Sequence, residues 1–448
     1  MEITCFKAYD VRGRMPDELN PDIALRIANA TVEYLGAKKV VVCRDIRLTS
    51  QELSDAVCTG IVAAGAEAID IGLGGTEMMY FATSYLGADA GIMVTASHNP
   101  ADYNGLKIVR EEARPISADT GLDVIRRLAE SDERQLSERG HRTTADVMSA
   151  YIDKIMSFVN PDAFKPLSIV ANPGNGGAGV VLDQLKYRLP FTFIDLNYEP
   201  DGSFPNGIPN PMLLENQTVT ANAVINQGAD FGVAWDGDFD RCFLFDEKGT
   251  FIEGYYIVGL LAESILAENS GAKVVHDPRM TWNTLEMVEA AGGEAVQSKS
   301  GHSFIKEKMR EVDAVYGGEM SAHHYFRDFS YADSGMIPWL LVAELISTSG
   351  KSLSQLVEER MAKFPASGEI NRKVADAKAT LQALHDRYAA DALSVEDVDG
   401  YSFEFPKWRF NIRMSNTEPV VRLNLETRGD QALMEAKTRE VLEVMDGG

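Results

Sequence analysis

The sequence has few cysteines and no long apolar run. Its four cysteines are scattered, and none forms a CxxC pair or the spacing of a disulfide framework: Cys5, Cys43, Cys58 and Cys242. This usage is typical of a reduced, cytoplasmic protein with small buried thiols. The first residues lack a basic region followed by an apolar core, so we expect no signal peptide. No apolar run reaches membrane-spanning length, and we expect no membrane association.

Basic residues are also scarce. The chain has 43 Lys and Arg against 67 Asp and Glu, a formal net charge of −24. Nucleic acids and anionic membranes select a positive surface, so this balance argues against both as partners. An anionic small molecule would have to be bound by a local cluster of Arg and Lys that overcomes the global field.

The chain is too long for one hydrophobic core, because 448 residues exceed the usual size of a domain. Short β-rich runs alternate with amphipathic helical stretches, the pattern of α/β domains. The expected strands lie at 39–43, 68–71, 91–94, 167–171, 230–234, 272–276, 294–296 and 314–316. Polar stretches at 134–145 and 364–370 resemble linkers, and strands are expected near Phe403 and Phe410.

We therefore predict three successive mixed α/β domains of similar design and a smaller C-terminal α+β domain around a central cleft. The predicted ranges are 1–144, 145–248, 249–366 and 367–448. In each of the first three, a late strand runs into a polar motif: Thr95–Pro100, Asp236–Arg241 and Gly317–His323. Ligands of open α/β sheets bind beyond the carboxyl ends of the strands, so we expect the three motifs to contribute to one site.

The first motif contains Ser97 on a tight strand-to-loop turn, a position suited to nucleophilic attack or to carrying a phosphate. The alternative is an ordinary turn whose polar side chains bond their own backbone. No Gly-x-Ser-x-Gly motif surrounds Ser97, which argues against an acyl-transfer hydrolase.

The second motif places Asp236, Asp238 and Asp240 at alternate positions after an apolar strand. Alternate residues of an extended chain point to one side, and two carboxylates ~4 Å apart repel by about 4 kcal/mol at an effective dielectric of ~20. The trio therefore calls for a cation, and oxygen ligands favour Mg²⁺ or Ca²⁺ over zinc. An EF-hand is excluded because its sixth position would be Arg241 instead of Gly. A solvated acidic turn is the alternative.

Three further features are weaker alone. Arg241 could form a salt bridge with the trio or a bidentate contact with phosphate. The loop from Gly317 to His324 offers carboxylate, hydroxyl and imidazole groups, which would suit a sugar ring or a metal. The segment Arg413–Thr417, with Arg422 nearby, could cradle a phosphate, although it lacks the Gly-Lys-Ser/Thr of a nucleotide P-loop.

Taken together and in order, these motifs resemble the α-D-phosphohexomutase family, especially its bacterial phosphomannomutases, over essentially the whole chain. The resemblance also includes Phe6–Gly13, Asn104–Lys107 and Lys299–His302. Ala322 replaces a frequent Gly, His324 is additional, and Thr76-Glu77 stands where many relatives have Thr-Pro.

The resemblance implies roles for matching residues. Ser97 would carry the phosphate and, with Asp236, Asp238 and Asp240, bind one Mg²⁺ per chain. Glu319 and Ser321 would recognise sugar hydroxyls. Arg413, Ser415, Asn416 and Thr417 would bind the non-reacting phosphate, with Arg422 beside them. The cleft would be lined by Tyr9, Arg12, Lys107, Arg241, Lys299, His302 and His323.

The implied reaction interconverts mannose 6-phosphate and mannose 1-phosphate through phospho-Ser97 and a hexose 1,6-bisphosphate, which also primes the enzyme. Mg²⁺ and Arg241 would offset charge on the transferring group. Lys107, His302 and His323 are the candidate bases, and the fourth domain is expected to close during turnover. The product would supply GDP-mannose synthesis in the cytoplasm, and the protein would be a monomer or homodimer. The alternatives are a dual phosphomannomutase/phosphoglucomutase, a metal-dependent sugar phosphatase and a catalytically silent sugar-phosphate-binding protein.

Overall fold

The computed structural model describes residues 1–132, 140–414 and 420–447. The chain divides into two compact units. Unit 1 comprises residues 1–251 and 325–353, and unit 2 comprises residues 252–324 and 354–448. Within the described residues, no helix has the length and apolar character that crossing a membrane requires.

Unit 1 begins with a sheet in the order β1-β5-β4-β2-β3-β7, with β6 paired to β5. Its strands are β1 (Val11–Arg14), β2 (Lys39–Arg44), β3 (Glu67–Leu73), β4 (Ala90–Val94), β5 (Tyr103–Arg110), β6 (Arg114–Pro115) and β7 (His141–Thr144). Strands β2, β3, β4 and β7 are parallel, whereas β5 is antiparallel to β4. This arrangement brings the carboxyl end of β4 beside the beginning of β5.

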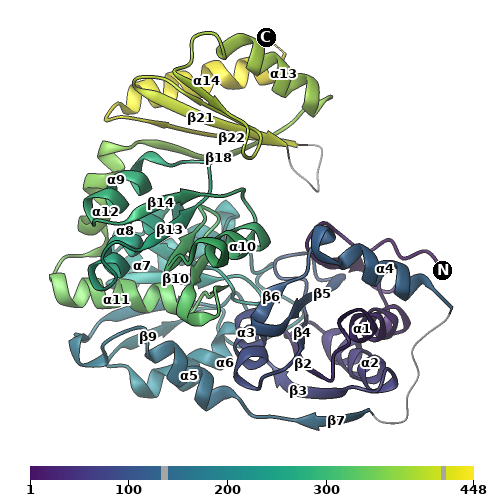
Figure 1. Ribbon diagram of the computed structural model, residues 1–448. Coiled ribbons are helices and arrows are strands. Elements are labelled where there is room, and N and C mark those ends of the chain that lie inside the picture. Colours follow the sequence, from purple (N-terminus) through teal and green to yellow (C-terminus); the bar gives the residue numbers. More distant parts are fainter. Residues whose placement is uncertain (133–139, 415–419, 448) are drawn as a thin grey trace. The chain divides into compact units, whose positions relative to one another are not determined.

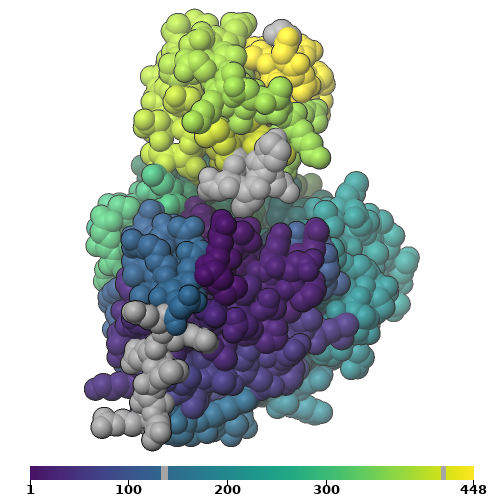
Figure 2. All heavy atoms as spheres, turned by 90° about the vertical axis from the view of Figure 1, so that its right-hand side faces the viewer, coloured from purple at the N-terminus to yellow at the C-terminus, as the bar shows by residue number. Residues whose placement is uncertain are grey.

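Helices cover both faces of this sheet, which explains why its central strands are continuous apolar runs. α1 (Pro21–Leu35), α2 (Ser50–Ala63) and α4 (Leu122–Glu130) lie on one face, and α3 (Thr76–Tyr85) lies on the other (Figure 1). α1 begins after Asn20, whose side chain accepts a hydrogen bond from the Ile23 amide, and ends at Gly36 in the left-handed region. The chain begins at the surface (Figure 2), but Ile3 and Cys5 are buried, and the Ile3 amide donates to Glu130.

The second sheet has the order β12-β11-β10-β8-β9. Its strands are β8 (Ser168–Asn172), β9 (Thr192–Asp195), β10 (Phe231–Trp235), β11 (Cys242–Phe245) and β12 (Phe251–Ile252). The helices of this part of unit 1 are α5 (Met148–Met156), α6 (Ala178–Leu185), α7 (Leu214–Gln227) and α11 (Ile337–Ser349). Trp339 of α11 packs edge-on against Trp235, with ring centroids 6.3 Å apart. β16 (His324–Phe326) and β17 (Ala332–Asp333) form an antiparallel pair.

Unit 2 contains three parallel strands in the order β14-β13-β15. They are β13 (Lys273–His276), β14 (Glu294–Gln297) and β15 (Tyr316–Gly318). The helices beside them are α8 (Gly254–Glu268), α9 (Trp282–Ala290), α10 (His302–Val312) and α12 (Leu353–Lys363).

Short 3-10 helices occupy Glu111–Ala113, Ala118–Thr120, Pro161–Ala163, Lys186–Arg188 and Arg327–Phe329 in unit 1.

The chain ends in an antiparallel sheet of unit 2 with the order β18-β22-β21-β20-β19. Its strands are β18 (Ala366–Lys373), β19 (Ser394–Glu396), β20 (Tyr401–Glu404), β21 (Trp408–Met414) and β22 (Val420–Thr427). α13 (Ala377–Tyr388) and α14 (Gln431–Met445) cover one face (Figure 1). An aromatic core fills the space between them, with Phe403 and Phe410 stacked at 4.7 Å.

The predicted α/β sheets and the final α+β domain are confirmed. Seven of the eight predicted strands are present within a residue or two of their predicted bounds, whereas the strand predicted at 314–316 is shifted to β15 (Tyr316–Gly318). The two predicted linkers are wrong in part, because 134–145 contains β7 and 364–370 contains most of β18. Both are edge strands of their sheets, and most of their residues are partly or fully exposed. Edge strands carry polar residues, so their composition imitates that of a linker. The four domain boundaries stay predictions.

Candidate active site

The serine site consists of Ser97, the Asp trio (Asp236, Asp238 and Asp240), Lys107 and Arg241. Ser97 follows β4 in a left-handed backbone conformation, with φ of 47°. Its amide donates to Thr95 Oγ1 at 2.9 Å, and its hydroxyl donates to Asp236 Oδ2 at 2.7 Å. Such backbone conformations are costly for a non-glycine residue and occur preferentially at functional sites. The structure therefore confirms that Ser97 and the Asp trio lie together.

Two arginines hold the loop that carries Ser97. Arg47 donates to the Ser97 carbonyl at 2.9 Å and to the Asn99 carbonyl at 2.7 Å. Arg12 donates to the Ala96 carbonyl at 2.6 Å and also pairs with Asp10. Arg12 holds the backbone before Ser97 and Arg47 holds the backbone from Ser97 onward, so the two guanidiniums together fix the strained turn from both sides.

The Asp trio follows β10 in a turn and is buried, so the alternative of a solvated acidic turn is wrong. The three carboxylates each offer an oxygen, and these oxygens lie within 4.8 Å of one another. Asp238 Oδ1 is buried and has no hydrogen-bond partner in the described part of the chain. A buried carboxylate oxygen without a partner is costly, and oxygen ligands are what Mg²⁺ prefers. The residues therefore fit a magnesium ion.

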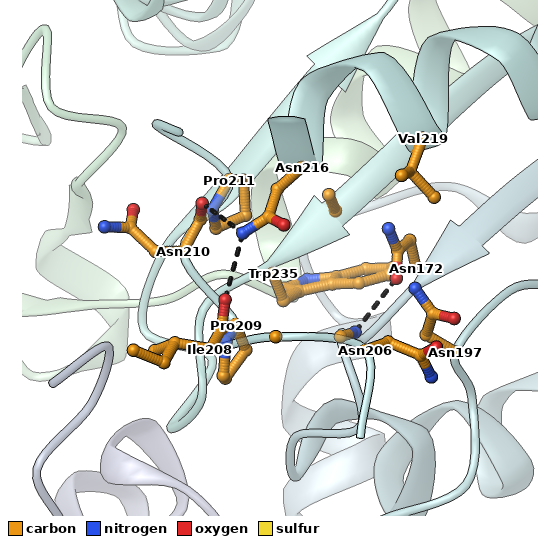
Figure 3. Close-up of a pocket in the computed structure, with 13 residues that line it drawn as sticks. Asn172, Asn197, Asn206, Ile208, Pro209, Asn210, Pro211, Asn216, Val219 and Trp235 are labelled. Atoms are coloured by element: carbon orange, nitrogen blue, oxygen red, sulfur yellow. Dashed lines mark hydrogen bonds between the residues drawn. The ribbon is translucent and has the colours of Figure 1, made fainter. Parts of the chain in front are cut away.

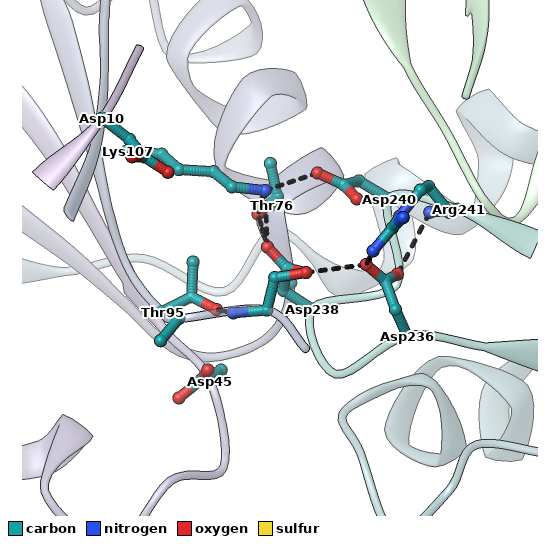
Figure 4. Close-up of polar contacts among 12 residues, drawn as sticks. Asp10, Asp45, Thr76, Thr95, Lys107, Asp236, Asp238, Asp240 and Arg241 are labelled. Atoms are coloured by element: carbon teal, nitrogen blue, oxygen red, sulfur yellow. Dashed lines mark hydrogen bonds and ion pairs between the residues drawn. The ribbon is translucent and has the colours of Figure 1, made fainter. Parts of the chain in front are cut away.

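Lys107 and Thr76 contact the trio from the first sheet and from α3 (Figure 4). Lys107 Nζ lies 2.7 Å from Asp238 Oδ2 and 2.5 Å from Asp240 Oδ2, and Thr76 Oγ1 donates to Asp238 Oδ2 at 2.5 Å. Burial would lower the pKa of Lys107, but the two carboxylates outweigh burial and raise it. Lys107 is therefore a cation in this arrangement.

Arg241 lies on the other side of the serine. It donates to Asp236 Oδ2 from Nε at 3.0 Å and from Nη2 at 2.8 Å, and Nη2 lies 2.6 Å from His98 Nδ1. Burial and the charges of Arg241 and Arg12 lower the pKa of His98, so its imidazole is neutral. Since a guanidinium can only donate, His98 Nδ1 is the acceptor and Nε2 carries the proton.

The serine loop and the Asp loop approach so closely that a side chain would not fit between them. A Cβ at Gly237 would lie 2.5 Å from the Ser97 carbonyl oxygen. This contact requires glycine at position 237 and fixes the distance between the serine and the Asp trio.

The predicted sugar-binding residues lie in unit 2 around Arg279. Arg279 Nη2 lies 3.4 Å from Glu319 Oε1 and 3.3 Å from Ser321 Oγ, and it also pairs with Asp277 at 2.8 Å. Glu319 accepts a further hydrogen bond from the Gly301 amide at 2.7 Å. The structure thus brings Glu319 and Ser321 together and adds a cation that the sequence did not reveal.

Of the remaining predicted residues, His302 and His323 face each other with ring centroids 6.4 Å apart. Lys299 is exposed beside Phe304, and Tyr9 is partly buried near the start of the chain. Arg413 and Arg422 both pair with Glu369, at 3.0 and 3.3 Å. Ser415, Asn416 and Thr417 lie outside the described residues.

The residues that sequence reasoning missed are Thr76, His98, Arg47, Arg279 and Glu369. His98 is adjacent to Ser97 and could have been included for that reason. Thr76 was noted only as part of Thr76-Glu77 and was given no role, whereas Arg47, Arg279 and Glu369 are single polar residues in segments without a motif that only the folded backbone brings to the sites. No spacing signal could have identified them.

A pocket beside Trp235 is lined by amide and proline side chains, including Asn172, Asn206 and Asn216 (Figure 3). The Asn216 amide donates to the Ile208 and Asn210 carbonyls, both at 2.9 Å. Asn172 accepts from the Gly174 amide and donates to Thr220. These amides are used in shaping the loops around the pocket, and we assign no ligand to it.

Comparisons with models of protein families show which family the chain belongs to. Models of the phosphoglucomutase/phosphomannomutase family match four segments: α/β/α domain I at 4–135, domain II at 149–249, domain III at 253–364 and the C-terminal domain at 369–443. The chain belongs to the phosphoglucomutase/phosphomannomutase family. A family protein of Burkholderia thailandensis with a crystal structure is 32% identical, with a TM-score of 0.87 over 99% of this chain and 98% of its own.

Curated relatives of this phosphoglucomutase/phosphomannomutase family are more similar in sequence. A protein of Xanthomonas campestris named "Phosphohexose mutases" is 58% identical over 100% of both chains. A protein of Escherichia coli named "Phosphomannomutase" is 56% identical over 99% of both chains. The identity extends over the full length, so both units have counterparts in these relatives.

Proposed function

We propose that the protein is a phosphomannomutase that interconverts mannose 6-phosphate and mannose 1-phosphate. The observation that carries the proposal is the hydroxyl of Ser97, on a strained turn, 2.7 Å from a carboxylate of the buried Asp trio. Similarity over the full length to proteins named phosphomannomutase supports the substrate. The reaction is an isomerisation by phosphoryl transfer.

In the proposed cycle, phospho-Ser97 transfers its phosphoryl group to the free hydroxyl of the sugar phosphate. The Oγ–P bond of Ser97 breaks, a new O–P bond forms on the sugar, and the proton of the attacking hydroxyl goes to a base. The resulting hexose 1,6-bisphosphate turns round and returns its other phosphoryl group to Ser97. The O–P bond at that end of the sugar breaks, a new Oγ–P bond forms, and the released sugar oxygen takes the proton held by the base, which leaves the isomeric sugar phosphate. Hexose 1,6-bisphosphate would also prime enzyme whose serine is not phosphorylated.

Asp236, Asp238, Asp240 and the Ser97 side chain would hold one Mg²⁺. When bound, such an ion offsets negative charge on the transferring phosphoryl group. Arg241 already lies beside Ser97 and would stabilise the same charge through its guanidinium. Arg12 and Arg47 hold the serine loop and keep the nucleophile in place.

In unit 2, we propose that Glu319 and Ser321 bind sugar hydroxyls and that Arg413 binds the phosphate that does not react. Tyr9, Lys299 and Arg422 are proposed to contribute to substrate binding. The pairing of Lys107 with two carboxylates favours its charged form. We therefore favour His302 or His323 as the base, because an imidazole nitrogen can accept a proton.

A dual phosphomannomutase/phosphoglucomutase is the second candidate. The observation that favours it is the 58% identity to a relative named "Phosphohexose mutases", which is as high as the identity to relatives named phosphomannomutase. Turnover of mannose 1-phosphate and glucose 1-phosphate under the same conditions separates the candidates. Equal rates would establish the dual enzyme.

The cellular setting is part of the same proposal. Mannose 1-phosphate is the sugar phosphate from which GDP-mannose is made, and we propose that the protein supplies this synthesis in the cytoplasm. Its partners would be small sugar phosphates, with no nucleic acid or membrane, and it would be a monomer or a homodimer.

Replacement of Ser97 tests the covalent step. Ser97→Ala should reduce mutase turnover by about 10³-fold or more, because the phosphoryl carrier is lost. The matched control is Ser157→Ala, since Ser157 is exposed and its hydroxyl donates to the Lys154 carbonyl of the preceding helix. Intact mass should show a phosphate on the unmodified protein that phosphatase removes and Ser97→Ala lacks. Unchanged turnover in Ser97→Ala would refute the mechanism, and stoichiometric release of inorganic phosphate would establish a phosphatase instead.

A further inference from the structure

Two arginines of the C-terminal sheet stand directly opposite each other. Arg413 of β21 is paired with Arg422 of β22 in the antiparallel register. Side chains in such opposite positions have Cβ atoms roughly 5 Å apart, and like charges there destabilise the sheet. An anion between the two guanidiniums removes this repulsion. The pair therefore forms an anion-binding site that requires a negative charge both in the free enzyme and in the enzyme with bound ligand.

Glu369 of β18 supplies that counter-charge. Its carboxylate lies 3.0 Å from Arg413 Nη2, 3.3 Å from Arg422 Nη1 and 3.5 Å from Arg279 Nη1. The side chain is 9% exposed, so the ion pairs are largely removed from water. One carboxylate thus contacts all three members of the arginine cluster, which comprises Arg279, Arg413 and Arg422.

The backbone is shaped to direct Glu369 at these arginines. The register between β18 and β22 shifts between Ala366 and Glu369, and Gly368 has a left-handed φ of 67°. The Asn424 amide donates to the Gly368 carbonyl at 3.3 Å and so fixes this irregularity. Bulges of this kind re-aim a side chain and are frequent beside functional sites.

Arg413 still has hydrogen-bonding capacity for a ligand. It donates to Glu369 from Nη2, whereas its buried Nε has no hydrogen-bond partner within residues 1–132, 140–414 and 420–447. A guanidinium commonly binds phosphate oxygens by donating hydrogen bonds from Nε and Nη2 together. A phosphate bound there would lie close to the Glu369 carboxylate, and the two anions would repel.

We propose that Glu369 is an exchangeable counter-ion for the phosphate of the substrate. It neutralises Arg413 and Arg422 in the free enzyme, and the sugar phosphate takes over these guanidiniums when it binds. This inference rests on the proposed function, in which Arg413 binds the phosphate that does not react. The bisphosphate intermediate must leave this site and present its other end during each cycle. A resident carboxylate weakens phosphate binding and therefore speeds that release.

The test is Glu369→Gln, which keeps the size of the side chain and removes its charge. Calorimetry with mannose 6-phosphate and, separately, with inorganic phosphate should give dissociation constants about tenfold lower than for the unmodified protein. Steady-state kinetics should show KM and kcat falling together, because release of the more tightly bound phosphate becomes slower. A loss of affinity or no change would overturn the proposal, since Glu369 would then only position the arginines.

Two further variants separate charge from shape. Glu286 also bridges two cations in unit 2, with both Arg360 and Lys363 at 2.7 Å, but these are not part of the arginine cluster. Glu286→Gln should leave phosphate affinity unchanged. Glu369→Asp keeps the charge but shortens its reach, so it should tighten phosphate binding by a smaller factor, about threefold. If Glu369→Gln does not fold, weaker or unchanged binding by Glu369→Asp overturns the inference.

The binding measurements do not depend on mutase activity. If the unmodified protein fails to interconvert mannose phosphates while Glu369→Gln binds phosphate more tightly, the counter-ion inference stands and the proposed function falls. If the protein is an active mutase and Glu369→Gln binds phosphate less tightly, the proposed function stands and the inference falls.

Discussion

The serine site and the arginine cluster solve the same electrostatic problem with opposite signs. At the serine site, carboxylates are buried together and pair with Lys107 and Arg241. At the arginine cluster, guanidiniums are brought together and pair with Glu369. Buried like charges are tolerated only when a counter-charge is near, so each site carries its own.

The two sites differ in how they are assembled from the chain. The Asp trio comes from five consecutive positions after one strand, so a single loop determines it. The arginine cluster combines residues from β21, β22 and the loop after β13, with Glu369 from β18. The composition of one loop therefore determines the Asp trio, whereas the arginine cluster depends on how several segments pack.

The largest effect on turnover is expected when one charge of the Asp trio is removed. Asp238→Asn should reduce mutase turnover by about 10³-fold, because a magnesium ligand and the partner of Lys107 and Thr76 are lost together. Turnover measured across a magnesium titration should show that added metal does not restore it. Chelation of metal from the unmodified protein should cause a similar loss that magnesium reverses.

The matched control is Asp195→Asn, because Asp195 pairs with Lys186 on the surface of the same unit. It should leave turnover within about twofold, as expected of an exposed ion pair. Full activity of Asp238→Asn would mean that the trio serves only the fold and is not needed for turnover.

Removing a buried charge from the C-terminal sheet, which carries Arg413 and Arg422, should reduce the stability of the fold. Glu426 of β22 is fully buried and accepts from Arg409 at 3.0 Å, from the Thr281 amide at 2.7 Å and from the Tyr255 hydroxyl. These contacts tie the C-terminal sheet to α8 and α9. Glu426→Gln leaves Arg409 buried without its counter-charge, so the free energy of unfolding should fall by about 3 kcal/mol.

Urea unfolding followed by circular dichroism measures this change, with Glu435→Gln as the control. Glu435 is exposed on α14 and accepts a hydrogen bond from Gln431, so its replacement should change stability by less than about 0.5 kcal/mol. Equal stability of Glu426→Gln and the unmodified protein would contradict the claim that the arginine cluster depends on how its segments pack.

The same contrast explains what could be predicted from the sequence. Ser97 and the Asp trio were predicted together because each follows an apolar strand, and the carboxyl ends of such strands carry functional loops. Arg279 and Glu369 gave no signal, because each is one charged residue in an unremarkable segment. Their role depends on the β18 bulge and on the cross-strand register, which are properties of the folded sheet. The polar composition of the edge strands β7 and β18 hides their pairing, which is why the sequence predicts linkers there.

The smallest expected effect concerns Glu253, which precedes α8 and lies beside the β18 bulge. A Cβ at Gly368 would be 3.0 Å from Glu253 Oε1. Burial raises the pKa of Glu253 to about 7, and the charge of Glu369 adds to this shift. An exposed Glu has a pKa of about 4.3, so the folded state binds more protons between these values. The resulting stabilisation is complete below about pH 4 and is lost as the pH rises through about 7.

Glu253→Gln removes this titration. The decrease in the free energy of unfolding between about pH 5 and about pH 8, measured by urea unfolding, should therefore be smaller in Glu253→Gln than in the unmodified protein. Glu369→Gln should act in the same direction, because Glu253 then ionises without a neighbouring negative charge. An identical pH dependence in all three proteins would mean that Glu253 is hydrated and does not sense Glu369. The carboxylates beside the arginine cluster would then be independent of one another, whereas those of the Asp trio converge on a common centre.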